Sequence, residues 1–102
     1  MNTSNNNGDI KRRDRHDIVV EILRTAVEGK IKTHIMYKAK LSYAQLNEYL
    51  PLLVDKGFLE NTSIKQKRTL KRVYKTTEKG MRFLDNFDSI KKLWSYPTNS
   101  SF

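Results

Sequence analysis

The feature that most constrains this chain is a fifteen-residue stretch, Asn61–Lys75, with six basic side chains and no acidic one. The formal net charge of all 102 residues is +9, so this stretch supplies two thirds of the excess. An unpaired charge is too costly to bury, so the stretch must lie at the surface, although apolar segments flank it on both sides. Many charge runs are only solvated faces, but the missing counter-charge here favours a surface that binds an anionic partner.

Length and composition limit the chain to one small domain. With 37% hydrophobic residues it can form one modest core. It has no cysteine, and His16 and His34 alone cannot hold a zinc ion. No apolar run approaches the roughly 18 residues of a membrane span, and no phosphate-binding glycine loop or nucleophile motif is present. We therefore expect a cytoplasmic protein without catalytic site, cofactor, metal or small-molecule ligand, and with nucleic acid as its partner.

Two helices are predicted near the N-terminus. The segment Arg13–Glu28 shows one apolar face at the helical period, and Gly29 is expected to close it as the C′ residue. The segment Lys30–Thr33 can supply a brief edge strand. A short helix, His34–Ala39, is then expected to start from Thr33 as its cap.

A third helix is expected after Ser42, which forms an S-x-x-Q capping box with Gln45. It should extend to about Lys56. Pro51 lies inside it, where a missing donor should kink or split the helix, and the sequence leaves these two outcomes open. Its predicted buried stripe is Leu46, Leu50, Leu53 and Val54.

The remainder reads as a hairpin and a last helix. Strands are predicted at Phe58–Thr62 and Thr69–Thr76, joined by a basic tip at Ser63–Arg68. Thr77 or Thr76 is expected to cap a helix that extends to about Trp94. The fold class is therefore α+β, a winged helix-turn-helix with a three-helix core and an extra C-terminal helix. We expect a DNA-binding domain over residues 13–76, a dimerisation helix over 77–95, and disordered tails at 1–12 and 96–102.

Three blocks of sequence resemble a known family. They are K-T-H-I-M-Y-K-A-K-L-S-Y-A-Q-L from Lys32, K-G-F-L-E from Lys56, and Y-K-T-T-E-K-G with a following F-L from Tyr74. They are similar to small archaeal winged-helix proteins regarded as transcriptional regulators, whose relatives include chromatin-type proteins that dimerise through a C-terminal coiled coil. The resemblance covers about residues 14–90. It implies binding of double-stranded DNA, with the helix after Ser42 in the major groove and the hairpin on the backbone.

The expected DNA contacts fall into two groups. Near the start of the third helix, Gln45 and Asn47 can pair with adenine, and Tyr43 can pack on a thymine methyl or bond a phosphate. Phosphate contacts are expected on the flanking turn and along the hairpin. The complete set is Lys38, Lys40, Ser42, Tyr43, Gln45, Asn47, Lys65, Lys67, Arg68, Lys71 and Arg72.

Two further features leave alternatives open. A second basic patch at Lys11–Arg15 reads equally as a DNA-binding arm or as a solubilising helix start. In the last helix the apolar residues recur at spacings of four, three and four, which is typical of a coiled-coil seam. This seam predicts a homodimer, unless the helix folds back over the first helix. Its residues are Phe83, Phe87, Ile90, Leu93 and Trp94.

The leading function is therefore that of a DNA-binding transcription regulator associated with the nucleoid. An architectural nucleoid protein of low sequence specificity is the first alternative. A winged helix used as a protein-interaction module is the second, but such a module should show an exposed apolar recognition face rather than uncompensated charge.

Overall fold

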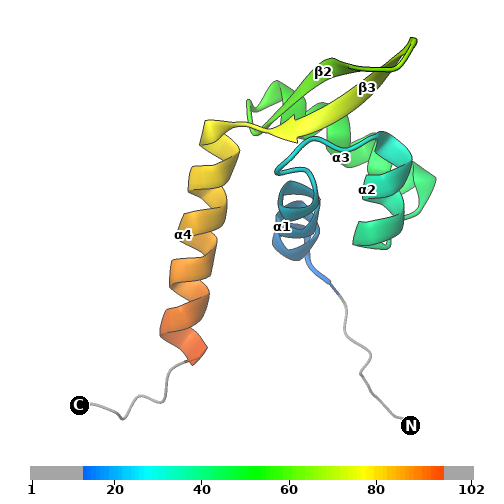
Figure 1. The fold of residues 1–102 in the computed structure, drawn as a ribbon. Coiled ribbons are helices and arrows are strands. Elements are labelled where there is room, and N and C mark those ends of the chain that lie inside the picture. Colours follow the sequence, from blue (N-terminus) through cyan, green and yellow to red (C-terminus); the bar gives the residue numbers. More distant parts are fainter. Residues whose placement is uncertain (1–12, 96–102) are drawn as a thin grey trace, which may run out of the picture.

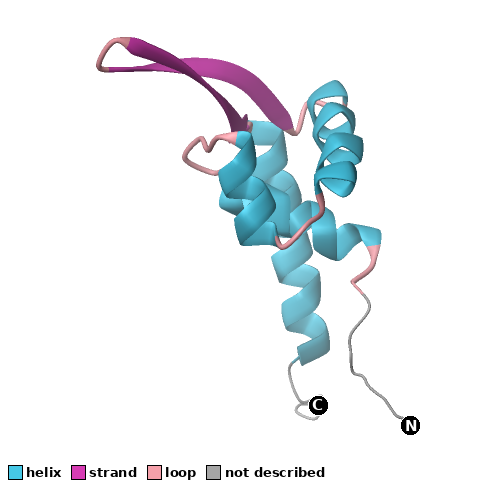
Figure 2. Ribbon diagram, turned by 90° about the vertical axis from the view of Figure 1, so that its right-hand side faces the viewer, coloured by secondary structure: helices cyan, strands magenta, loops and turns pink. Residues whose placement is uncertain are grey.

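The computed structural model describes residues 13–95 and contains four helices and one hairpin in that range. They are α1 (Arg15–Thr25), α2 (Lys32–Ala39), α3 (Tyr43–Asp55), β2 (Leu59–Gln66), β3 (Thr69–Thr76) and α4 (Glu78–Ser95). The first three helices form the body, from which the hairpin extends upward while α4 extends downward (Figures 1 and 2). This is the predicted α+β winged-helix fold. The expected tails, 1–12 and 96–102, lie outside the described residues.

The core lies between the three body helices and the base of the hairpin. The apolar faces of α1 and α3 supply most of it, as their periodicity predicts. The base of the hairpin adds one side chain from each strand, and α4 adds one from its second turn. The largest fully buried side chains are Ile22, Leu23, Ile35, Leu46, Leu50, Leu53 and Leu59.

Both ends of α1 lie inside the predicted range. Asp14 caps the helix in a capping box with Asp17, and the backbone N–H of Asp17 donates to the Asp14 carboxylate at 2.9 Å. The C-cap is Ala26, so the prediction of Gly29 as the C′ residue is wrong. The carbonyl of Ala26 accepts from the N–H groups of both Gly29 and Thr76, and this turn ends the helix.

The predicted cap of α2 is also wrong. The N-cap is Ile31, which has extended backbone and makes no side-chain cap bond, while Thr33 lies inside the helix. The cause is Lys30, whose N–H and carbonyl pair with Tyr74 of β3 at 3.0 and 2.8 Å. This isolated bridge replaces the expected edge strand, and α2 begins two residues earlier than predicted.

Helix α3 begins and ends as predicted. Ser42 is its N-cap, and Lys56 is its C-cap. The helix continues through Pro51, whose ring is exposed, so it is not split there. The buried stripe contains Tyr49 and lacks Val54, which is 36% exposed, in contrast to the prediction.

The hairpin is longer than predicted. Strands β2 and β3 pair without interruption from Leu59–Thr76 to Gln66–Thr69, so only Lys67 and Arg68 form the turn. Lys67 has a positive φ of 55°, which such a tight turn requires. At the base, the buried Thr76 hydroxyl donates to the carbonyl of Leu23 at 2.7 Å and fixes the hairpin to α1.

Helix α4 is attached to the body at its first turns. The Thr77 hydroxyl accepts from the N–H of Gly80 at 3.0 Å, which confirms the predicted cap, and donates to the carbonyl of Gly57. At Gly80 a Cβ would lie 2.4 Å from the carbonyl oxygen of Phe58, so only glycine permits this close approach. Beyond the buried Leu84, Phe87 still packs partly against the core and Asp88 pairs with Arg24 of α1, and the last turns of α4 extend past the body (Figure 1).

Candidate nucleic-acid interface

The start of α3 is fixed by reciprocal hydrogen bonds. The N–H of Gln45 donates to the Ser42 hydroxyl, and the N–H of Ser42 donates to the Gln45 side-chain oxygen, both at 3.0 Å. This capping box satisfies two backbone donors and occupies the amide oxygen of Gln45. The amide NH₂ of Gln45 still has donors to offer. Because Leu46 and Leu50 anchor the opposite face in the core, α3 presents its polar face in a fixed position.

A cluster around Tyr43 stands beside that capping box. The Tyr43 side chain is 62% exposed, and the Lys32 ammonium lies over its ring at 4.8 Å from the centroid. A side-chain hydrogen bond from Asn47 lowers the pKa of Tyr43, and the positive charge of Lys32 lowers it further. The cluster therefore joins an aromatic ring, an amide and a cation at the exposed start of α3.

The two lysines that flank the turn into α3 lie in different environments. Lys40 is the C-cap of α2 in the left-handed conformation, with φ 56°, and is exposed. Lys38 is also exposed, but it belongs to the face of α2 that meets the end of α1. Both lysines line one cavity with Arg13 and Glu21, and Lys38 also faces a second cavity between α1 and α2.

The outer half of the hairpin, residues 63–72, carries the basic residues predicted for phosphate contact, and we call it the wing. Every side chain in it is exposed. Because partners across the strands share a face, the register places Lys65 and Arg72 on one face with Leu70, and Lys71 on the other with Ile64. Lys67 and Arg68 form the tip. The wing therefore presents basic side chains on both faces and at its end.

The second basic patch has a structural role where it is described. The Arg13 guanidinium donates to the carbonyls of Ala39 and Lys40 at 2.8 Å each and so satisfies the C-terminal end of α2. Arg15 pairs with Glu48 of α3 at 3.3 Å. Lys11 and Arg12 lie outside the described residues.

Neither a metal site nor a membrane-spanning helix has a candidate among the described residues. No three histidines, cysteines or acidic side chains among them lie close enough to hold a metal ion. None of the four described helices is both long and apolar enough to cross a membrane.

Sequence reasoning missed the contacts between distant elements. Lys32 and Tyr43 are the first residues of α2 and α3, and Arg13 reaches carbonyls 26 and 27 residues away. No local sequence spacing predicts such contacts. His34 and Lys38 did carry a signal, since an interval of four places two side chains on one side of a helix, whereas Lys30 precedes the helix.

Comparisons with known proteins agree with this fold. A family model described as winged helix-turn-helix matches residues 12–95. The uncharacterized protein MJ0287 of Methanocaldococcus jannaschii is 35% identical over 65 residues, which span 63% of this chain and 66% of that protein, just under two thirds of its length. The crystal structure of Sso10a-2, a DNA-binding protein from Sulfolobus solfataricus, superposes with a TM-score of 0.67 at 26% identity, and the match covers 79% of this chain and 81% of that one.

Proposed function

Because the chain belongs to the winged helix-turn-helix family, we propose that it binds double-stranded DNA, with α3 in the major groove and the wing on the phosphate backbone. The similar fold of the DNA-binding protein Sso10a-2 supports this proposal. In this division of roles, the polar start of α3 reads base edges and the wing positions the protein. We further assign the protein to transcription regulation in the cytoplasm.

The observation that carries the proposal is the uncompensated charge of the wing. Its five basic side chains, Lys65, Lys67, Arg68, Lys71 and Arg72, are all exposed, and none forms an ion pair within the described part of the chain. Like charges at this density repel one another, and a polyanion relieves that repulsion while releasing its own counterions.

At the start of α3, the groups offered to base edges are the Tyr43 ring, the amide NH₂ of Gln45 and the amide of Asn47. Glu48, which would repel phosphate, is instead paired with Arg15 of α1. The exposed face of α3 that points toward DNA is therefore free of unpaired negative charge in its first two turns. This arrangement suits the electronegative surface of a groove.

The test is a fluorescence anisotropy titration with two duplexes, one random and one taken from the region upstream of the protein's own coding sequence. We expect saturable binding of both at about 50 mM salt, weakening steeply as salt rises. A preference of about 10³ or more for one natural sequence supports a regulator, whereas near-equal binding supports an architectural protein. Absence of saturable binding at low salt contradicts the proposal of DNA binding.

We also propose that two copies pair through α4 and present two α3 helices to one DNA. Phe83 and Phe87 pack partly against the core, while Ile90 and Leu93 are 56% and 72% exposed. Trp94 completes the predicted seam, although its side chain lies outside the described part. A fold-back of α4 over α1 would bury Ile90 and Leu93. Ile90 and Leu93 extend the apolar face that begins with the half-buried phenylalanines. Their exposure therefore favours a second copy of the chain as the partner that buries this face.

Sedimentation tests the dimer. The intact chain should sediment as a dimer at tens of micromolar, and Ile90→Asp should shift it to monomer because a carboxylate cannot be buried in the seam. Ser89→Asp, on an exposed position one residue away, adds the same charge and should leave the dimer intact. A monomeric wild type, or a dimeric Ile90→Asp variant, contradicts pairing through α4.

A further inference from the structure

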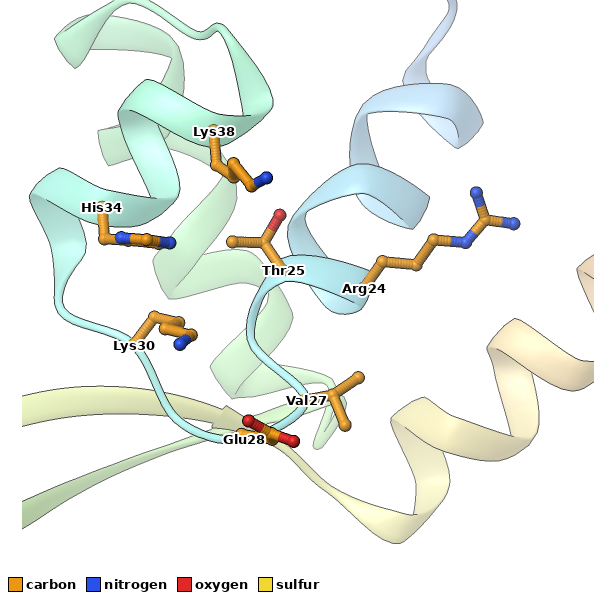
Figure 3. Close-up of a pocket in the computed structure, with 7 residues that line it drawn as sticks. All are labelled: Arg24, Thr25, Val27, Glu28, Lys30, His34 and Lys38. Atoms are coloured by element: carbon orange, nitrogen blue, oxygen red, sulfur yellow. The ribbon is translucent and has the colours of Figure 1, made fainter.

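A second basic site lies away from the polar face of α3 and from the wing. It is a cavity of about 310 Å³ between the end of α1 and one side of α2 (Figure 3). Lys30 precedes α2, and His34 and Lys38 follow on the helix at intervals of four residues. Figure 3 shows the three side chains directed into the gap between the two helices.

The remaining lining side chains are occupied or turned away. The Arg24 guanidinium is paired with Asp88 of α4, and Figure 3 shows it pointing away from the lysines. The Thr25 hydroxyl donates to the carbonyl of Glu21 at 2.8 Å. Glu28 is the one acidic side chain in the lining, and neither it nor the three basic residues form an ion pair within residues 13–95. The cavity therefore has a surplus of donors over acceptors.

The basic side chains are held on elements of fixed position. Lys30 is bound to β3 by two backbone hydrogen bonds with Tyr74. Lys38 lies in the last turn of α2, whose terminal carbonyls are satisfied by Arg13. Such support fixes the backbone from which the three side chains extend into the cavity. The cavity also lies beside the base of β3, the strand that returns from the wing.

We propose that this cavity binds a phosphate group through Lys30, His34 and Lys38. Lysine ammoniums bind phosphate as point charges, and a histidine nitrogen donates a further hydrogen bond. The volume is at the lower end of the range for small-molecule pockets, so it suits a phosphate with a small attached group. The phosphate can belong to the backbone of bound DNA or to a free phosphorylated compound, and the two sources predict different experimental results.

The first arm uses inorganic pyrophosphate and isothermal titration calorimetry without DNA, at low and constant ionic strength. We expect one saturable site per chain in the wild type. The affinity for pyrophosphate should be at least tenfold weaker in Lys30→Gln/His34→Gln/Lys38→Gln. The matched control is Lys56→Gln/Lys92→Gln, which removes the same two full charges at exposed positions outside the cavity. The control should bind as the wild type does. Thermal melts establish that both variants are folded.

The second arm measures the salt dependence of DNA binding with the same three proteins. If the phosphate belongs to DNA, the cavity variant should lower the slope of log K against log salt by about 1.8, from 0.9 for each of two lysine contacts. If it belongs to a free compound, the slope should equal that of the control. Only this arm depends on the proposed DNA binding. Pyrophosphate binding that is absent in the wild type, or unaltered in the cavity variant, overturns the proposal when the slope is also unchanged.

Discussion

Helix α3 and the wing are expected to contact the same DNA, but they are supported in opposite ways. Four residues of α3 are buried, and its first turn is closed by a reciprocal capping box. Every residue of the wing is exposed, and only the backbone ladder between β2 and β3 holds it. The core therefore dictates where α3 presents its side chains. The core does not fix the side chains of the wing, so the part that the wing plays in DNA binding depends on its charge.

The two kinds of support suit two kinds of DNA recognition. Reading a base edge requires donors and acceptors in fixed positions, which a helix packed on a core provides. Contact with phosphate requires charge near the backbone and tolerates a less rigid support.

The largest expected effect comes from truncating one leucine in each region. Leu50→Ala should lower the free energy of unfolding by about 2–5 kcal/mol, because Leu50 is fully enclosed in the core. Leu70→Ala on the wing should change it by less than about 0.5 kcal/mol, because Leu70 is 69% exposed. Urea denaturation of both variants measures the difference. Equal losses would mean that the wing is as well packed as α3.

A smaller effect is expected from removing charge at the wing. Lys67→Gln/Arg68→Gln/Lys71→Gln should weaken binding to random and upstream duplexes by the same factor, worth about 1–3 kcal/mol per wing. The melting temperature should hardly change, since all three side chains are exposed. Anisotropy at one fixed salt concentration measures the loss. A loss confined to one duplex would show that the wing reads sequence.

Two substitutions on α3 should separate base contact from helix stability. Asn47→Ala should cost about 1–3 kcal/mol on the preferred duplex and relax the preference at one base position. Gln45→Ala should weaken binding too, and it should also lower the free energy of unfolding by about 0.5–2 kcal/mol, because it removes half of the capping box. Titration of single-base variants of the duplex, with a thermal melt of each protein, distinguishes the two. Equal losses of Asn47→Ala on all duplexes would assign Asn47 a positioning role.

The smallest effect concerns the ionisation of Tyr43. Its pKa should lie below the ordinary value of about 10, chiefly through the bond with Asn47. Because the folded-state pKa is the lower one, the ionised form adds stability above about pH 10, and this contribution is lost as the pH falls through the folded-state pKa. The difference between ultraviolet titrations of the wild type and Tyr43→Phe isolates this group. Asn47→Ala and Lys32→Gln should each raise the pKa of Tyr43, and an unchanged pKa in either variant would contradict the cause assigned to that residue.

The features that could be predicted from sequence are those set by neighbouring residues. The Ser42 capping box involves residues three positions apart, and its geometry follows directly from that spacing. The buried leucines of α3 follow from the helical period. Val54 was misplaced because the stripe continues toward Tyr49 on its other flank, and periodicity alone does not choose between two flanks.

The features that could not be predicted depend on tertiary pairing. The start of α2 is set by the bridge between Lys30 and Tyr74, which are 44 residues apart. The full length of the hairpin could not be predicted, because both faces of the wing are exposed. Its strands therefore lack the alternation of buried and exposed positions by which a strand is identified. The candidate DNA-binding site shows the same limit of sequence-based prediction. The basic residues of the wing were evident as a charge run, whereas the stacking of Lys32 on Tyr43 was not.

The most direct test of the central claim is the salt dependence of DNA binding in three proteins: the wild type, the wing variant Lys67→Gln/Arg68→Gln/Lys71→Gln, and Asn47→Ala. We expect the wing variant to flatten the slope of log K against log salt by about 2.7 per wing, from 0.9 for each of three contacts, on every duplex. We expect Asn47→Ala to keep the wild-type slope and to lose preference between duplexes. An unchanged slope in the wing variant would contradict the division of roles between α3 and the wing.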